Sequence, residues 1–188
     1  DVVLSVTSAF GHGVITPPET CHVCYCLTPA RFLWNYQTYI EREGLGRLAR
    51  LVLPAFLGGL RRWDRRAADR VDRFVAISRT VQQRIATCYG REAPIIYPPV
   101  RTDGTPTVEE PGDYFLIVSR LVPYKRIDLA VAAFNALGLP LRIVGSGRDR
   151  AALQAMARDN IQFLGYLADD EVRRQMAGCR AFIFPGEE

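Results

Sequence analysis

The chain has 188 residues, of which 48% are hydrophobic and 23% charged, so it can form a folded core and is not a disordered chain. Its longest apolar run, Leu51–Leu60, is too short to cross a bilayer, and the composition also excludes a collagen, a coiled coil and a disulfide scaffold. The net charge of +4 comes from residues 41–73 alone, which hold nine arginines against five acidic residues, and no nucleic-acid-binding motif accompanies them.

The first hundred residues alternate short β-rich runs with helical runs, the pattern of βαβ units in a parallel sheet. The pattern predicts strands over Val2–Ser8, His22–Leu27, Arg73–Ile77 and Pro94–Tyr97. It predicts helices over Arg31–Tyr39, over Leu45–Asp72 with a break at Pro54, and from the N-cap residue Ser78 to Gly90.

The second half of the longest helix has an apolar stripe and an arginine-rich side. The stripe consists of Phe56, Leu60, Trp63, Ala67 and Val71, whereas Arg61, Arg62 and Arg65 are expected to point away from it. Two interpretations of these arginines remain open. They form a solvated face, partly paired because Arg65–Asp69 and Asp69–Arg73 lie at i, i+4 spacing, or residues 61–73 contact an anionic membrane surface.

Three of the five cysteines crowd into the run Cys21-His22-Val23-Cys24-Tyr25-Cys26. A zinc site would need a second ligand pair at a defined spacing, and Cys88 and Cys179 each stand alone. We therefore expect no metal site and interpret these residues as reduced, half-buried thiols of a cytosolic protein.

The composition changes after Val100. Residues 101–112 are rich in turn residues and lack periodicity, which predicts a linker between a domain over 1–100 and a domain over 113–188. The β-rich runs restart after it at Tyr114–Ser119, Leu141–Val144, Ile161–Leu164 and Ala181–Phe184, with helical runs between them. The first three are continuous apolar runs, as in a parallel sheet covered on both faces, so two α/β halves are predicted.

Ligands of open α/β sheets bind at the carboxyl ends of the strands, and three such ends in the second half carry suitable groups. Arg120 and Lys125, between a strand and a helix, suit a diphosphate, although such a loop can also be merely solvated. Glu187 and Glu188 could hold sugar hydroxyls or form a frayed acidic terminus.

The run Gly145-Ser146-Gly147 follows the second of these strands and resembles the start of a dinucleotide fingerprint. Arg150 stands at the third glycine position, so the run is weak evidence for NAD. We expect the glycines to let the backbone turn tightly past a ligand or into the helix.

In the first half, Thr28, Arg31 and Trp34 follow the end of a predicted strand. A hydroxyl, a guanidinium and an indole together suit a polar, ring-shaped ligand. The alternative is a helix N-cap with Trp34 in the core.

Together these motifs resemble the retaining family-four glycosyltransferases. In the second half the resemblance rests on Ser119-Arg120-Leu121, Lys125, Gly145-Ser146-Gly147, Phe163-Leu164-Gly165-Tyr166 and Phe184-Pro185-Gly186-Glu187-Glu188. The first half is similar to the mannosyltransferase-like branch that builds bacterial surface polysaccharides, through residues 22–34, Trp63-Asp64, residues 72–78 and Tyr97-Pro98-Pro99-Val100.

This resemblance implies the GT-B architecture, in which two Rossmann-like domains flank an active cleft. Residues 1–100 would be the later part of the acceptor-side domain, and residues 113–188 the early part of the domain that holds the nucleotide-diphosphate sugar. It implies transfer of a hexose onto a glycan or lipid-linked acceptor with retention of configuration, without a metal or other cofactor, with GDP-mannose as one donor to consider. It also implies a cytoplasmic enzyme, at the inner face of the membrane where the acceptor is lipid-linked.

The resemblance also assigns roles to single residues. Arg120 and Lys125 match the basic pair that neutralises the departing diphosphate, which would stabilise the charge that builds as the glycosidic bond loosens. Glu188 matches the first acid of the family's Glu, seven residues, Glu motif, with Glu187 as its neighbour, and Ser119 falls in the donor-binding loop.

The remaining assignments concern two loops. Gly145 and Gly147 match the turn on the nucleotide side. Thr28, Pro29 and Arg31 match the cleft-facing loop of the first domain.

The chain departs from the family pattern at several points. Leu27 stands where the branch usually has a histidine thought to contact the donor sugar, and Arg101 stands where an aspartate is common. The family's upstream glycine-rich loop and second motif glutamate do not occur, so we expect an internal fragment that need not be active by itself. Two other hypotheses remain: a non-catalytic nucleotide-sugar-binding regulatory or scaffold domain, and an NAD-dependent oxidoreductase.

Overall fold

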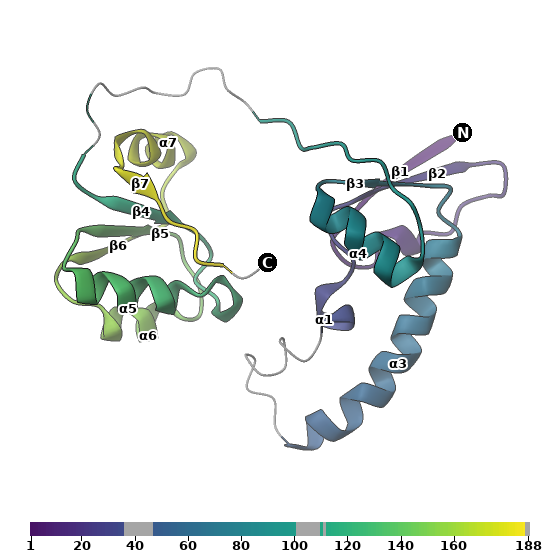
Figure 1. Ribbon diagram of the computed structural model, residues 1–188, viewed down its shortest axis with the longest axis horizontal. Coiled ribbons are helices and arrows are strands. Elements are labelled where there is room, and N and C mark those ends of the chain that lie inside the picture. The colour runs from purple at the N-terminus through teal and green to yellow at the C-terminus, as the bar shows by residue number, and fades with distance from the viewer. Residues whose placement is uncertain (36–46, 101–109, 111, 187–188) are drawn as a thin grey trace. The chain divides into compact units, whose positions relative to one another are not determined.

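The computed structural model describes residues 1–35, 47–100, 110 and 112–186. The chain divides into two compact units, Asp1–Val100 (unit 1) and Arg101–Glu188 (unit 2), and each contains one parallel sheet (Figure 1). Most of the predicted linker 101–112 and the second half of the predicted helix Arg31–Tyr39 lie outside the described residues.

The sheet of unit 1 has the strand order β1-β2-β3, with β1 at Val2–Thr7, β2 at Cys21–Cys26 and β3 at Arg73–Ala76. The register pairs Val2 with Cys21 and Val23 with Arg73, so all three strands run in parallel. These strands confirm the prediction to within one residue at each end. The fourth predicted strand, Pro94–Tyr97, is reduced to a single parallel bridge between Ala76 and Ile95.

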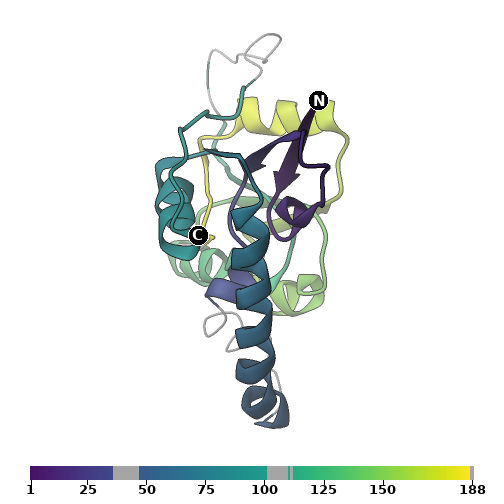
Figure 2. The same ribbon diagram turned by 90° about the vertical axis from the view of Figure 1, so that its right-hand side faces the viewer.

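Unit 1 also contains the short helices η1 (Gly11–Gly13) and α1 (Arg31–Trp34) and the longer helices α3 (Arg47–Asp69) and α4 (Arg79–Tyr89). The predicted break at Pro54 is wrong, because α3 runs through this residue as one helix (Figure 2). A proline removes one helical hydrogen bond and can bend a helix without ending it. The boundaries of α4 are confirmed: the hydroxyl of Ser78 accepts a hydrogen bond from the Val81 N–H, and Gly90 ends the helix in the left-handed conformation.

Helices α3 and α4 cover one face of this sheet, and the core between them contains Cys24, Cys26, Phe74, Ala76, Ala68, Val71, Val81 and Ile85. The predicted stripe on α3 is only partly correct. Ala67 and Val71 are buried, but Phe56 is 66% exposed, whereas Leu57 and the charged Asp64 are buried. The buried stripe is turned because Asp64 finds polar partners inside the unit.

The sheet of unit 2 has the order β6-β5-β4-β7, and every neighbouring pair is parallel. Its strands are β4 at Phe115–Val118, β5 at Leu141–Val144, β6 at Ile161–Gly165 and β7 at Ala181–Phe182. The helices are η2 at Pro123–Lys125, α5 at Ile127–Leu137, α6 at Arg150–Met156 and α7 at Asp169–Gly178. All four predicted strands are confirmed, although β7 is shorter than expected.

The inner strand β4 of unit 2 is covered on both faces, as its apolar run predicted. The neighbouring residues Leu116 and Ile117 point to opposite faces, and both are almost fully buried. Ile117 packs in a cluster with residues of α5 and α6, and Leu116 packs in a second cluster with Val172 of α7. Among the described residues, no helix combines the length and the apolar character needed to span a membrane.

Candidate functional site

The order of the strands in unit 2 creates a topological switch point. The chain passes from β4 outward to β5 and β6, and then returns to place β7 on the opposite side of β4. The loop after β4 therefore leads to one side of this strand while β7 lies on its other side, and such a reversal of strand order is where open α/β sheets bind ligands. The predicted residues Ser119, Arg120 and Lys125 all follow β4.

The loop after β4 is held in place by backbone contacts with the loop after β5. The Leu121 N–H donates to the Ser146 carbonyl at 2.9 Å, and the Leu121 carbonyl accepts from the Asp149 N–H at 3.2 Å. Leu121 is fully buried, whereas the neighbouring Arg120 is exposed. This arrangement fixes the backbone and leaves the guanidinium of Arg120 accessible to a ligand.

Gly145 and Gly147 are required by this close contact between loops. A Cβ at Gly145 would collide with the carbonyl oxygen of Ser119, and one at Gly147 would collide with that of Leu121. Gly145 also has a φ of +127°, which side chains disfavour. The immediate reason for the two glycines is thus the approach of the 119–121 backbone, which orders the loop that carries Arg120.

Lys125 lies beside the segment that follows β7. Its Nζ is 4.8 Å from the ring centroid of Phe184, and its Cδ is close to Gly186. Glu187 and Glu188, which come directly after this segment, lie outside the described residues. The structure therefore brings Lys125 to the segment that precedes the two predicted acids, across the switch point.

Arg126 is a residue of this loop that the sequence analysis missed. It is the one non-glycine residue with a positive φ (51°) in the described part of the chain, and it precedes α5. Its guanidinium donates two hydrogen bonds of 3.1 Å to Asp128, which lowers the pKa of that carboxyl. This pair joins the turn at Arg126 to the first turn of α5, and the signal available in the sequence was the Arg-x-Asp spacing at the helix start.

In unit 1, the loop after β2 forms part of a pocket of about 330 Å³. The predicted residues Pro29 and Arg31 line it, together with Trp34, Asn35, Thr80, Gln83, Arg84, Thr87 and Cys88. The third predicted residue, Thr28, accepts a hydrogen bond of 3.2 Å from Arg84. The contribution of α4 could not be predicted from the sequence, because its polar residues form an ordinary exposed helix face until the loop is placed beside them.

A buried polar cluster lies behind this pocket. Trp34 donates its indole N–H to the Oδ2 of Asp64 at 2.7 Å, and the Nε2 of His12 is 3.2 Å from the Oδ1 of Asp64. His12 and Asp64 are both almost fully buried. Burial, and after it the Asp64 carboxylate, raises the pKa of the nearby Tyr89 hydroxyl. Asp64 therefore holds a wall residue of the pocket from inside the unit.

The arginines of α3 do not all point to solvent as predicted. The Nε of Arg61 donates to the Leu33 carbonyl at 2.8 Å, and the Nε of Arg65 donates to the Cys88 carbonyl at 3.0 Å. The Arg65 guanidinium also lies 4.9 Å from the Trp34 ring centroid. The expected orientation is thus partly correct: Arg65 is exposed as predicted, Arg61 is half-buried, and both also bond backbone carbonyls of the unit.

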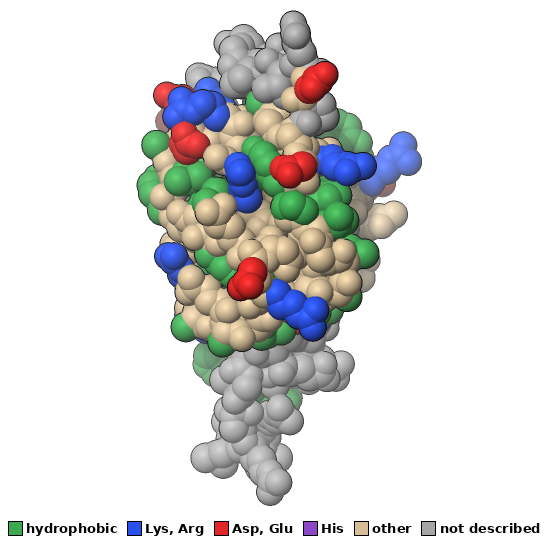
Figure 3. All heavy atoms as spheres, turned by 90° about the vertical axis from the view of Figure 1, so that its left-hand side faces the viewer, with side chains coloured by type: hydrophobic (Ala, Val, Ile, Leu, Met, Phe, Trp, Pro, Cys, Tyr) green, Lys and Arg blue, Asp and Glu red, His purple; other side chains and the backbone are tan. Residues whose placement is uncertain are grey.

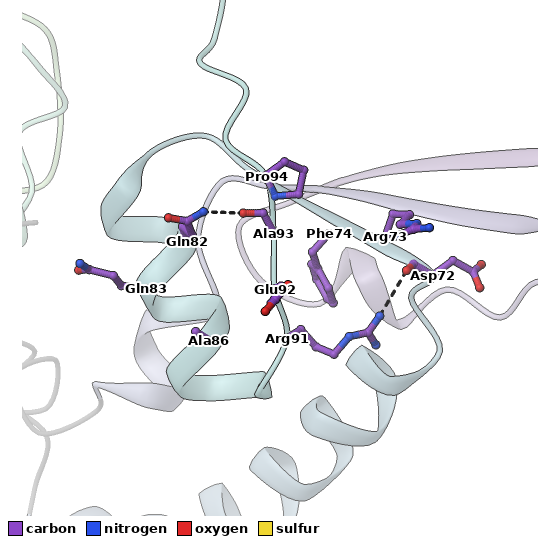
Figure 4. Close-up of a pocket in the computed structure, with 10 residues that line it drawn as sticks. All are labelled: Asp72, Arg73, Phe74, Gln82, Gln83, Ala86, Arg91, Glu92, Ala93 and Pro94. Carbon is purple, nitrogen blue, oxygen red and sulfur yellow. Dashed lines mark hydrogen bonds between the residues drawn. The ribbon is translucent and has the colours of Figure 1, made fainter.

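A larger pocket of about 800 Å³ lies near the amino end of β3, away from the loops described above (Figure 4). Arg91 in its wall donates to the backbone carbonyls of Ala68, Val71 and Asp72. This arginine thus ties α3 to the following strand, and we interpret the pocket as a consequence of packing.

The cysteines of unit 1 are mostly inside the core. Cys24, Cys26 and Cys88 are buried, and burial raises the pKa of the Cys26 thiol to about 12. No group of three or more His, Cys, Asp or Glu side chains suitable for a metal ion occurs in the described ranges.

On the face of unit 2 shown in Figure 3, acidic and basic side chains are scattered and form no single charged patch.

Comparisons with known proteins give the second unit a family match. Residues 104–188 match the family described as glycosyl transferases group 1. No curated protein matches the chain.

Two solved structures are similar in fold. One is HepE of Anabaena in complex with UDP and glucose, with 15% identity and a TM-score of 0.56 over 86% of this chain and 65% of that one. The other is AviGT4, a glycosyltransferase involved in avilamycin A biosynthesis, with 16% identity and a TM-score of 0.54 over 98% of this chain and 45% of that one. The chain thus spans less than two thirds of either protein. It has the α/β, Rossmann-like fold of GT-B glycosyltransferases, and its residues 104–188 match glycosyl transferases group 1.

Proposed function

We propose that the protein is a glycosyltransferase that moves a hexose from a nucleotide-diphosphate sugar to a glycan or lipid-linked acceptor, with retention of configuration and without a metal. The observation that carries the proposal is the family match of residues 104–188, the unit in which Arg120 and Lys125 follow the central strand at a topological switch point. In this reaction the bond from the anomeric carbon to the diphosphate oxygen breaks, and a bond to the acceptor oxygen forms on the same face of the sugar. The proton of the acceptor hydroxyl passes to the departing diphosphate.

Arg120 and Lys125 are the residues that we propose to stabilise the departing diphosphate. Negative charge grows on this group as its bond to the sugar lengthens, and fixed cations stabilise the charge without reorganisation. We propose that Ser119, Gly145 and Gly147 form the donor-side loops. Glu188, with Glu187, would contact the donor sugar and the ribose.

Unit 1 is proposed as the later part of the acceptor-side domain, with Thr28, Pro29 and Arg31 in the acceptor site, and unit 2 as the early part of the donor domain. We further propose membership of family four, in the mannosyltransferase-like branch of surface-polysaccharide synthesis, with GDP-mannose as the first donor to test. The cytoplasmic face of the membrane would be the place of action. Residues 61–73 would then contact anionic lipid, which co-sedimentation with anionic vesicles at low and high salt tests.

A non-catalytic nucleotide-sugar-binding domain is the second candidate. Leu27 favours it, because this residue directly follows β2 at the position where the branch usually has a histidine, and its apolar side chain cannot hydrogen-bond a sugar. Both candidates predict nucleotide-sugar binding, and only the first predicts a product.

A thermal-shift screen of nucleotide-diphosphate sugars tests the donor site. A ligand at about 100 times its Kd stabilises the folded state by about 2.7 kcal/mol, so the donor that binds raises the unfolding temperature. We expect Arg120→Ala and Lys125→Ala to abolish this shift. The matched control is Arg180→Ala, which removes an exposed arginine from the amino end of β7, at the opposite edge of the same sheet.

Transfer is tested with the whole protein, the bound donor and a glycan acceptor, with the anomeric configuration of the product read by NMR. We expect the two substitutions in the basic pair to reduce the rate about a hundredfold or more. Binding without any product would select the second candidate, and rates unaffected by both substitutions would refute the site assignment.

A further inference from the structure

The pocket between the loop after β2 and α4 has the size and the lining of a small-molecule site. Its volume of about 330 Å³ lies within the usual range of about 300–1,000 Å³ for ligand pockets. Trp34 and Pro29 supply apolar surface, and the side chains of Asn35, Thr80, Gln83 and Thr87 supply neutral hydrogen-bonding groups. Apolar surface beside hydroxyls and amides suits a sugar ring.

The charge of the lining is entirely positive. Arg31 from α1 and Arg84 from α4 both line the pocket. None of the described residues that line it is acidic. Arg84 is oriented by its hydrogen bond of 3.2 Å to the hydroxyl of Thr28. The two guanidiniums come from different elements, so the fold keeps two like charges at one small site.

The surroundings of the pocket increase this positive potential. The guanidiniums of Arg61 and Arg65 lie 5.8 and 4.9 Å from the ring centroid of Trp34. Behind the wall, the carboxylate of Asp64 is buried and already accepts the indole N–H of Trp34. Two guanidiniums that line one pocket can bind an anionic group through charge-assisted hydrogen bonds.

We propose that this pocket binds a phosphorylated sugar, with the phosphate between Arg31 and Arg84 and the sugar ring against Trp34. The inference rests on the proposed function and gives its acceptor a chemical class: a sugar that carries a phosphate or diphosphate group. A carboxylate is satisfied by one guanidinium fork, whereas the three oxygens of a phosphate match two guanidiniums and a hydroxyl such as that of Thr80.

The test is an NMR titration of the ¹⁵N-labelled chain with glucose 1-phosphate, followed through the backbone amides of α4. We expect saturable shifts at Thr80, Arg84 and Thr87. Methyl glucoside, which lacks the charge, and methyl glucuronide, which carries a carboxylate, are expected to bind at least about tenfold more weakly, because a charge-assisted pair is lost or reduced.

Arg84→Gln is expected to raise the Kd for glucose 1-phosphate about tenfold or more. The control Arg79→Gln removes the same charge from an exposed position of the same helix that does not line the pocket, and should change the Kd less than twofold. The dispersion of the amide spectrum shows whether Arg84→Gln is folded. If it is not, Arg31→Gln removes the other guanidinium of the pocket, the one on α1, and tests the same prediction.

Equal effects of Arg84→Gln and Arg79→Gln, equal binding of the glucuronide, or no α4 shifts would each overturn the proposal. Donor binding is read separately, from the amides of unit 2 with GDP-mannose and UDP-glucose in wild type and Arg120→Ala. If glucose 1-phosphate shifts no α4 amides while the nucleotide sugar still binds, the phosphorylated acceptor alone is refuted. If the α4 amides shift but no nucleotide sugar binds to unit 2, the proposed function alone is refuted.

Discussion

The two units repeat the same strand and helix pattern but position their polar residues in different ways. In unit 2 the backbones of two loops touch at Gly145 and Gly147, and this contact carries the exposed cation Arg120. In unit 1 a buried carboxylate, Asp64, holds Trp34 from within, and the pocket is formed by side chains of α1 and α4.

The comparison shows that one fold type can order a site through main-chain packing or through a buried polar cluster. A backbone contact tolerates no added atom, whereas a polar cluster depends on the charge and hydrogen-bonding capacity of its members. Unit 2 should therefore be most sensitive to added volume at glycine, and unit 1 to lost polar groups.

The largest effect is expected from Gly145→Ala and Gly147→Ala. Each added methyl collides with a backbone carbonyl oxygen of the loop after β4, so unit 2 should lose about 3 kcal/mol or more of stability. Unfolding followed through amide signals of unit 2 measures this loss. Gly58→Ala is the control, because it meets open space within α3 and should stabilise the helix by up to about 1 kcal/mol. If the stability of unit 2 were unchanged, its two loops could move apart to accept the methyl group. The proposed difference between the two units in how they order their loops would then be wrong.

Asp64→Ala should cost unit 1 about 2–3 kcal/mol, because it leaves the Trp34 indole N–H and the His12 ring without their buried partner. Denaturant unfolding read from unit 1 amides measures the change. Asp69→Ala removes a carboxylate from the exposed end of the same helix and should change stability by less than about 0.5 kcal/mol. Equal effects of the two substitutions would mean that the cluster contributes nothing beyond helix charge.

Acidification should weaken unit 1 before unit 2. Burial lowers the pKa of His22, so the unfolded chain binds a proton more readily than the folded one. The stability from neutral His22 is present above its ordinary pKa of 6.5 and is lost below it, with a slope of at most about 1.4 kcal/mol per pH unit. In unit 2 the lowered pKa of Asp128 gives stability that is lost only as the pH falls below the usual aspartate range.

Unfolding measured between pH 7 and pH 4 with signals from each unit checks this order. His22→Gln should flatten the pH dependence of the stability of unit 1 and leave that of unit 2 unchanged. A simultaneous decline of both units in the wild type would contradict the assignment to His22.

The smallest effect concerns thiol reactivity. Cys21 is exposed, whereas burial raises the pKa of Cys24, Cys26 and Cys88 and lowers their thiolate content. Brief alkylation near pH 7.5, read by mass spectrometry, should modify Cys21 first and the partly exposed Cys179 of unit 2 next. Labelling of all five at equal rates, as expected after denaturation, would show that the unit 1 core opens readily.

Much of the fold could be predicted from local patterns. The strands of unit 2 were found because their apolar runs end at turn residues, and α4 was found because Ser78 and Gly90 suit its two ends. The break at Pro54 was wrong because a helix can continue past a lost hydrogen bond. The stripe of α3 was misplaced because a charged residue outside it, Asp64, is buried among polar partners.

The candidate site residues also follow from a simple rule, and their roles stay a prediction. Arg120, Lys125, Pro29 and Arg31 were chosen because each follows a strand end, a rule that needs only the order of elements. Arg84 was missed because nothing in its helix distinguishes it from Arg79, and only the position of Thr28 does so.

The sequence by itself determined the alternation of strands and helices and the loops that carry polar groups, because both follow from local periodicity and turn chemistry. Only the tertiary structure decided which of those groups meet. Lys125 lies beside Phe184 because β7 returns to the free side of β4, and Trp34 meets Asp64 because α3 packs its polar residue inward. Such pairs join residues that are 30 or more positions apart, and strand order and burial bring them together where local pattern cannot.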